Sequence, residues 1–157
     1  MSDAARAQTT ALRPLRRDDL DDVVRIDALH TGDAKPAYWT RIFDTFLGSS
    51  GRERTFGFGI EGAHGLAGYL FGEIRAVEFG SETCGWVFAI GIEREGTRKG
   101  HASALLDAAR RRFAQEGVHK IRTMVRRNDV PVLSFFRARG FVGGPYVQLE
   151  LNGEEQS

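Results

Sequence analysis

The sequence contains little cysteine and no long hydrophobic run. Cys84 is the only cysteine among 157 residues, which excludes an intrachain disulfide and a cysteine-rich zinc site. No apolar run approaches the roughly 18 residues that a membrane-spanning helix needs. Residues 1–10 lack the apolar stretch of a secretory signal. These absences predict a cytoplasmic protein with no membrane partner and no metal site.

Extremes of composition are lacking as well. A hydrophobic content of 41% and a charged content of 27% are ordinary for a globular protein, which argues against a disordered or fibrous chain. A chain of 157 residues is long enough for one domain with a sizeable core. We expect a disordered N-terminus over residues 1–9, a single domain over residues 10–151 and a flexible tail over residues 152–157.

The net charge is only +1, but the basic residues are gathered in one part of the chain. Residues 94–139 contain 12 of the 22 Lys and Arg residues and 4 of the 21 Asp and Glu residues. Such a local surplus of positive charge predicts an anionic partner. Composition leaves two classes of partner open, a nucleic acid and a small molecule that carries several phosphates.

The hydrophobic period changes several times along the chain and predicts alternating strands and helices. Strands are expected over residues 10–15, 55–60, 66–74, 83–92, 120–125 and 146–151. Helices are expected after a cap at Asp18 or Asp19, over residues 38–47, after Gly100 and over residues 129–139. The order βααβββαβαβ predicts an α/β fold whose mixed, mostly antiparallel central sheet is flanked by helices.

A strand, a loop and a helix start follow one another in residues 90–102, IGIEREGTRKGHA. The first turn of a helix offers unpaired N–H groups and the positive end of the helix dipole, which together attract phosphate. Gly100 and Ala102 would let a phosphate approach, and Arg98 and Lys99 add positive charge. Neither a Walker loop nor the dinucleotide-binding glycine pattern is present. The residues alone leave phosphate binding and an ordinary strand-to-helix connection open.

Three segments in this order resemble the GCN5-related N-acetyltransferase (GNAT) family. In the first, Ile92, Gly100 and Ala102 fit the family's acyl-CoA loop, Arg/Gln-x-x-Gly-x-Gly/Ala, although Thr97 occupies the Arg/Gln position. The second is Asp129, at the usual spacing of a family Asn, with Asn128 beside it. The third is Phe135–Phe141, which ends in the family's Gly-Phe pair. The expected element order from Thr10 to Leu151 is also similar to that of the family.

The resemblance implies a GNAT-like acyl-CoA N-acyltransferase fold with acetyl-CoA as co-substrate. The pantetheine arm would pair with the backbone of residues 90–92 where parallel strands splay apart, and the pyrophosphate would lie on amides of residues 97–102. The basic surplus would then face the phosphates of CoA. The implied cofactor-binding residues are Ile90, Gly91, Ile92, Thr97, Arg98, Lys99, Gly100, His101, Ala102 and Phe136.

The residues that move protons are less well defined. Family members often place a Tyr on the short late helix as general acid, and the equivalent position here is Phe136, which cannot donate a proton. Ser134 and Tyr146 are possible substitutes. One branch of the family uses a Glu on the central strand as base, and that position here is Trp86. Glu82 has the same strand parity and is the predicted catalytic residue, with a surface position at the start of the strand as the alternative.

The sequence therefore predicts an N-acetyltransferase that moves an acetyl group from CoA to a primary amine by direct attack in a ternary complex. The acceptor would be a small molecule or a peptide, and a homodimer is expected. The alternative is a non-catalytic acyl-CoA-binding regulatory module, because Thr97, Trp86 and Phe136 depart from the family pattern. A nucleic-acid-binding domain is a further alternative, which predicts binding that falls steeply with salt and survives saturation with CoA.

Overall fold

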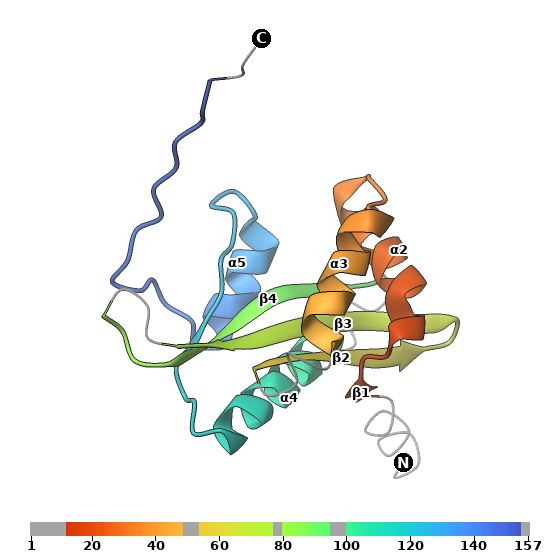
Figure 1. The fold of residues 1–157 in the computed structure, drawn as a ribbon, viewed down its shortest axis with the longest axis horizontal. Coiled ribbons are helices and arrows are strands. Elements are labelled where there is room, and N and C mark those ends of the chain that lie inside the picture. The colour runs from red at the N-terminus through yellow and green to blue at the C-terminus, as the bar shows by residue number, and fades with distance from the viewer. Residues whose placement is uncertain (1–11, 49–53, 77–79, 95–99, 155–157) are drawn as a thin grey trace. The chain divides into compact units, whose positions relative to one another are not determined.

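The computed structural model describes residues 12–48, 54–76, 80–94 and 100–154 (Figure 1). The chain divides into two compact units, residues 1–123 and residues 124–157, and each is described by itself. The first unit carries the sheet and three helices, and the second carries one helix and the C-terminal segment. The single domain expected over residues 10–151 stays a prediction.

The first unit is built on a five-stranded sheet with the strand order β1-β2-β3-β4-β5. Strands β1 to β4 pair antiparallel, and β5 pairs parallel to β4. The strands are β1 (Leu12–Pro14), β2 (Thr55–Gly62), β3 (Gly65–Arg75), β4 (Cys84–Ile92) and β5 (Ile121–Arg122). The expected mixed, mostly antiparallel sheet is confirmed.

Helices cover both faces of this sheet (Figure 1). A short 3-10 turn, η1 (Arg17–Asp19), leads into α2 (Leu20–Thr31), which is followed by α3 (Pro36–Leu47). On their face of the sheet, the rings of Phe43 and Phe46 lie 5.5 and 5.4 Å from the ring of Phe71 on β3. On the other face, α4 (His101–Gln115) packs Phe113 against Phe56 of β2 at 5.0 Å. The buried core therefore consists of two aromatic-rich layers with the sheet between them.

The start of α2 differs from the expectation that an aspartate side chain caps it. Asp19 is the residue before the helix, but its side chain makes no cap hydrogen bond to α2. Its carboxylate instead accepts two hydrogen bonds from Arg13 at 2.8 and 2.9 Å and one from the backbone N–H of Arg16 at 2.7 Å. Asp19 already has helical backbone angles as part of η1, so its side chain reaches back to β1 instead of forward into α2.

The second unit contains α5 (Val130–Ala138), where a helix was expected over residues 129–139. Asp129 begins the helix, because its carboxylate accepts a hydrogen bond from the backbone N–H of Val132 at 3.3 Å. The strand expected over Tyr146–Leu151 is not formed, so the predicted order is confirmed only as far as α5. Pairing with a neighbouring strand is what defines a strand, and no described segment provides that pairing here.

Candidate active site

β4 and β5 pair over a very short length and then part. Their parallel register covers only Gly85 with Ile121 and Trp86 with Arg122. Two hydrogen bonds mark this junction, from Gly85 N–H to the carbonyl of Lys120 at 2.8 Å and from the Thr123 hydroxyl to the carbonyl of Val87 at 3.0 Å. β4 continues to Ile92 without a further described partner on that side. The parallel pairing of β4 with β5 is therefore present over two residue pairs, and pantetheine binding beyond it stays a prediction.

A β-bulge in β4 decides which backbone groups face the gap. Ala89 pairs with Phe71 and Val87 pairs with Gly72, so Phe88 is an extra residue on β4. A bulge of this kind reverses the alternation of the backbone groups beyond it. Before the bulge, the backbone of Gly85 and Val87 is turned toward β5.

Beyond the bulge, the even-numbered residues face the gap. The N–H of Glu93 donates to the carbonyl of Ala67 at 2.9 Å, which makes Gly68 and Ile92 a non-hydrogen-bonded pair. The backbone groups of Ile92, and of Ile90 two residues earlier, consequently point away from β3. Those of Gly91 are turned toward β3. Of the three strand residues implied to bind pantetheine, Ile90 therefore turns its backbone groups away from β3, and Ile92 does so with its N–H, because its carbonyl accepts from His30.

The end of β4 is held by the end of α2. The His30 Nε2 atom lies 2.6 Å from the carbonyl oxygen of Ile92, and because a carbonyl only accepts, Nε2 carries the proton and donates. The Arg94 guanidinium donates to the carbonyl of Leu29 at 3.0 Å, and Arg25 forms an ion pair with Glu93. No sequence pattern marks this contact of His30. Its position at the last turn of α2 is what brings it to β4.

The first turn of α4 has the features expected of an anion site. Gly100 precedes the helix with a φ of 75°, a left-handed conformation that favours glycine, and the space around its α-carbon is open. Among the described residues, no side chain caps this end and no acidic residue lies in the first turn. His101 and Ala102 are half-buried there. Thr97, Arg98 and Lys99, also predicted to bind the cofactor, lie outside the described residues.

Phe136 of α5 is buried. Its ring lies 5.1 Å from that of Phe135 and 5.0 Å from that of Phe141, in edge-to-face contacts. Phe141 of the Gly140-Phe141 pair singled out in the sequence is therefore one of the two rings that pack against Phe136. These contacts give Phe136 a packing role within its own unit, and its predicted contact with the cofactor stays a prediction.

Glu82, the predicted catalytic residue, precedes β4 and is 66% exposed at its side chain. Its carboxylate forms an ion pair with Lys120 Nζ at 2.6 Å. The hydrogen bond and charge of Lys120 hold the pKa of Glu82 below its ordinary value, which makes the carboxylate a weaker base. The geometry is that of a surface ion pair at the start of the strand, and catalysis by Glu82 stays a prediction.

Trp86, at the family's glutamate position, lies beside an ion pair on β3. Trp86 is paired in register with Glu73, and the guanidinium of Arg75 lies 4.4 Å from the centre of its indole ring. Glu73 accepts a hydrogen bond from Arg75 Nε at 2.6 Å, and its side chain is 23% exposed. Glu73 is thus more enclosed than Glu82. Cys84, two residues before Trp86, is fully buried, with Arg122 Nη1 at 3.7 Å from its sulfur.

An acidic group and several aromatic rings meet where α2 and α3 face β3. The Asp27 carboxylate accepts a hydrogen bond from the indole N–H of Trp39 at 3.0 Å and pairs with Lys35 at 3.2 Å. The ring of Trp39 lies 5.5 Å from that of Tyr69. Burial, helped by the negative charge of Asp27, raises the pKa of Tyr69, so its hydroxyl stays protonated at neutral pH. Trp39, Phe43 and Phe46 of this aromatic face are buried in the core.

No described helix is long and apolar enough to cross a membrane. No group of three or more His, Cys, Asp or Glu side chains in the described ranges is arranged to hold a metal ion.

Comparison with protein-family models matches residues 20–141 to the acetyltransferase (GNAT) family. The match covers most of the chain and includes the splayed strands, the α4 entrance and α5. The protein therefore belongs to the GNAT acetyltransferase family, which the sequence motifs had indicated. A search of curated proteins found no significant match.

Solved structures share the fold at low sequence identity. Aminoglycoside 6'-N-acetyltransferase AAC(6')-Ig from Acinetobacter haemolyticus superposes with a TM-score of 0.74 at 16% identity, covering 92% of this chain and 99% of that one. AAC(6')-Iy in complex with CoA gives a TM-score of 0.77 at 13% identity, over 90% and 93%. A transcriptional regulator from Bacillus halodurans gives 0.74 at 15% identity, over 90% and 98%. At these identities the likeness establishes the fold and no more.

Proposed function

We propose that the protein is an acetyl-CoA-dependent N-acetyltransferase that acts on the primary amine of a small molecule or peptide. The observation that carries this proposal is the bulge at Phe88, which turns backbone groups of Ile90 and Ile92 away from β3, on the side of β4 where β5 pairs. An extended amide-containing chain such as pantetheine can pair with a strand that presents its backbone in this way. The uncapped first turn of α4, in the same family motif, suits the pyrophosphate.

The reaction requires the protein mainly to position the amine and the thioester and to supply hydrogen-bond donors. CoA supplies the thioester, whose carbonyl oxygen gains negative charge when an amine attacks. Backbone N–H groups on the open side of β4 would stabilise that charge, as donors fixed in a strand need no reorganisation. Holding amine and thioester in line supplies the proximity contribution. Because the donors are backbone groups, the departures from family side chains at Trp86 and Phe136 are compatible with catalysis.

Two observations bear on the chemistry of the acceptor amine. The relatives named AAC(6')-Ig and AAC(6')-Iy are aminoglycoside acetyltransferases, which makes aminoglycosides sensible first probes. On this chain, the acidic groups Asp27 and Glu73 lie on the α2–α3 side of the sheet, and both are partly enclosed. Partly enclosed carboxylates favour a cationic acceptor. The predicted homodimer also belongs to this proposal.

A non-catalytic acyl-CoA-binding module is the second candidate. The buried Phe136 at the general-acid position favours it, because a phenyl ring donates no proton. One similar solved structure also carries the name of a transcriptional regulator. Such a module would bind acetyl-CoA and release no free thiol with any amine.

The test is calorimetric titration with acetyl-CoA and with dephospho-CoA, followed by a free-thiol assay over a panel of amines that includes aminoglycosides. We expect micromolar binding of acetyl-CoA, weaker binding without the 3'-phosphate, and thiol release with at least one amine. Binding without turnover would favour the regulatory module. Absence of binding to either nucleotide would overturn the proposal.

A matched pair of variants locates the site on α4. Ala102→Glu places a negative charge in the first turn, and Gln115→Glu places the same charge at the exposed last residue of the same helix. We expect Ala102→Glu to weaken acetyl-CoA binding at least about tenfold, which corresponds to about 1.4 kcal/mol, and Gln115→Glu to leave it unchanged. Equal effects of both variants would contradict the placement.

A further inference from the structure

A pocket of about 620 Å³ lies at the edge of the sheet where β1 ends, and we call it the edge pocket. Its walls come from β1 and the residue after it, from β2, from the end of α3 and from the second half of α4. β1 pairs with β2 only from Phe58 to Ile60. One further bond runs from the Leu15 N–H to the carbonyl of Gly57 at 2.9 Å. The volume is within the range of pockets that hold small organic ligands.

The lining of the edge pocket is mostly apolar. Phe46 at the end of α3 and Phe56 on β2 are buried and contribute to its wall. Phe58 and Leu47 are half-buried and Pro14 is exposed, so part of the apolar lining remains in contact with water. An apolar chain that enters the pocket covers this surface, which is favourable in proportion to the apolar area removed from water.

The charged side chains that line the edge pocket are both basic. They are Arg111 and Arg112 of α4, and none of the described lining residues is acidic. Arg112 is already engaged, because it forms an ion pair with Glu116 and lies 5.5 Å from the centre of the Phe56 ring. Arg111 is exposed and has no hydrogen-bond or ion-pair partner in the part of the chain that the structure describes. Its guanidinium can therefore bind a carboxylate without breaking an existing contact.

We propose that the edge pocket binds a small organic acid with an apolar chain, of the class of medium-chain aliphatic carboxylates. The carboxylate pairs with Arg111, and the chain lies along Leu47 and Phe58 toward Phe56. The apolar walls disfavour a ligand with several charges, and the basic lining disfavours a cation. The proposal stands independently of the proposed function, because the edge pocket shares no lining residue with β4 or with the first turn of α4.

The first test is a titration of the full chain with octanoate, followed by two-dimensional proton–nitrogen NMR. We expect a Kd below about 1 mM, with the largest backbone shifts in residues 56–58 and 108–112 and none in residues 90–92. Butanoate should bind at least about tenfold more weakly, because a shorter chain leaves more of the apolar lining in water. Absence of saturable shifts, shifts centred on residues 90–92, or equal affinities for the two acids would overturn the proposal.

The second test asks whether the pocket recognises the negative charge. Octanol and octylamine keep the eight-carbon chain and replace the carboxylate with a neutral and a positive group. We expect octanol to bind about threefold more weakly than octanoate, which is the contribution of an exposed ion pair, and octylamine to bind more weakly still. Equal affinities for octanoate and octylamine would mean that any apolar chain adheres there, and would overturn the recognition of a carboxylate.

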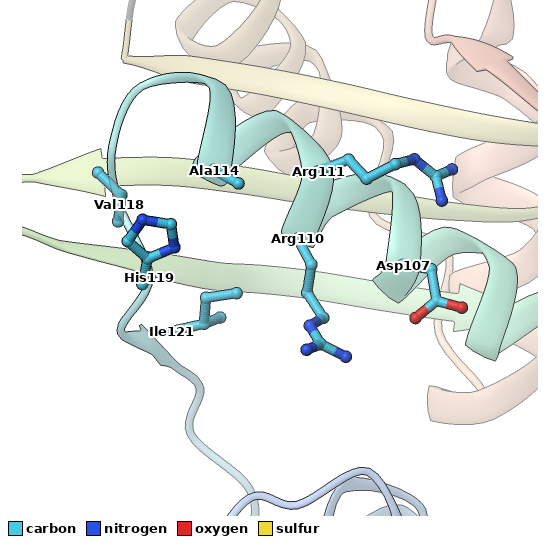
Figure 2. A pocket seen from close by; sticks show the side chains of 7 residues that line it. All are labelled: Asp107, Arg110, Arg111, Ala114, Val118, His119 and Ile121. Carbon is cyan, nitrogen blue, oxygen red and sulfur yellow. The ribbon is translucent and has the colours of Figure 1, made fainter.

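The neighbouring arginine on α4 provides a matched control. Arg110 is also exposed but does not line the edge pocket, and Figure 2 shows Arg110 and Arg111 leaving α4 in different directions. Arg111→Gln removes the guanidinium and should weaken octanoate binding about threefold while leaving octanol binding unchanged. Arg110→Gln should leave the binding of both ligands unchanged. An equal loss of octanoate affinity in the two variants would assign the effect to the overall positive charge of α4, and would overturn the pairing with Arg111.

Discussion

The two flanks of the sheet are built differently. From β1 to β3 the strands pair over most of their length, and a buried carboxylate, Asp19, fixes β1 to the start of α2 through Arg13. From β4 to β5 the register covers two residue pairs, and the rest of β4 turns backbone groups into a gap. Among the described residues, the first flank pairs its strands along most of their length, and on the second flank β4 has no strand partner on the β5 side beyond Trp86.

This difference assigns separate tasks to the two flanks. Buried backbone groups in folded proteins are nearly always paired, so a strand that leaves some open at mid-sheet is a position where a ligand can complete the ladder. The stability of the fold then depends mainly on the paired flank, through its aromatic layers and its buried ion pair. We therefore expect substitutions on the closed flank to change stability, and substitutions on the open flank to change cofactor binding.

The largest effect is expected from Asp19→Asn on the closed flank. Burial by itself would raise the pKa of Asp19, but hydrogen bonds from Arg13 and from the Arg16 backbone outweigh it and hold the pKa below its ordinary 3.8. Asparagine leaves the part-buried Arg13 without its charged partner, at a cost of about 3 kcal/mol in the free energy of unfolding. Urea unfolding at pH 7 measures it, with exposed Asp18→Asn as the control. An equal loss in both would contradict the role of this pair.

The same carboxylate gives the closed flank a pH dependence. Because the folded pKa of Asp19 is lowered, its contribution to stability is fully present above the unfolded value and is lost as the pH falls below about 3.8. We expect the wild type to lose more stability than Asp19→Asn between pH 5 and pH 2 in parallel urea titrations. Identical acid profiles would assign the acid sensitivity to other carboxylates.

A smaller effect is expected from Gly91→Ala, which lies at the boundary between the flanks. A Cβ at Gly91 would lie 2.6 Å from the ring of Tyr69, closer than packed atoms tolerate. Moving that buried ring costs about 2 kcal/mol of unfolding free energy. Gly143→Ala is the control, since its added methyl would meet no atom within 4 Å. If Gly91→Ala and the control have equal free energies of unfolding, the ring of Tyr69 moves aside without a measurable cost.

His30→Leu tests the open flank with a still smaller expected effect on stability. It removes the hydrogen bond to the Ile92 carbonyl, which is worth about 1 kcal/mol. We expect a larger relative change in the KM for acetyl-CoA than in kcat, because His30 is a positioning residue for the end of β4. His30→Gln keeps a donor and should restore most of the affinity. Unchanged KM in His30→Leu would show that β4 keeps its position without this bond.

Most of the architecture follows from the sequence because hydrophobic period and glycine punctuation are local signals. The helix expected over residues 38–47 is α3, and the strand expected over residues 83–92 is β4, each within two residues. The entry to α4 after Gly100 was also predicted, since a left-handed residue before a helix favours glycine. The strand expected over Tyr146–Leu151 was wrong for the described chain, because periodicity shows that a segment suits a sheet and not which sheet accepts it.

The candidate site was predicted only where it depends on local sequence. The bulge at Phe88 has no sequence signature, yet it determines that Ile90 and Ile92, and not Gly91, turn their backbone into the gap. The contact of His30 with Ile92 spans 62 positions and is equally invisible in the sequence. Strand parity placed Glu82 with Trp86, but parity says nothing of where a strand begins, and β4 begins only at Cys84.

The smallest change in stability is expected from Glu82→Gln. Comparing this variant with Glu73→Gln tests which of the two glutamates is the general base. Glu82 is exposed and its pKa is lowered by Lys120, so glutamine there should leave the melting temperature, kcat and the pH profile nearly unchanged. Glu73 is more enclosed, beside Trp86 and in an ion pair with Arg75, so the same isosteric change there should lower kcat more than Glu82→Gln does. Measurements of kcat from pH 5 to pH 9 on both variants separate the two residues. A large loss of kcat and an altered profile in Glu82→Gln alone would assign catalysis to Glu82, and would mean that the Lys120 ion pair opens when the acceptor binds.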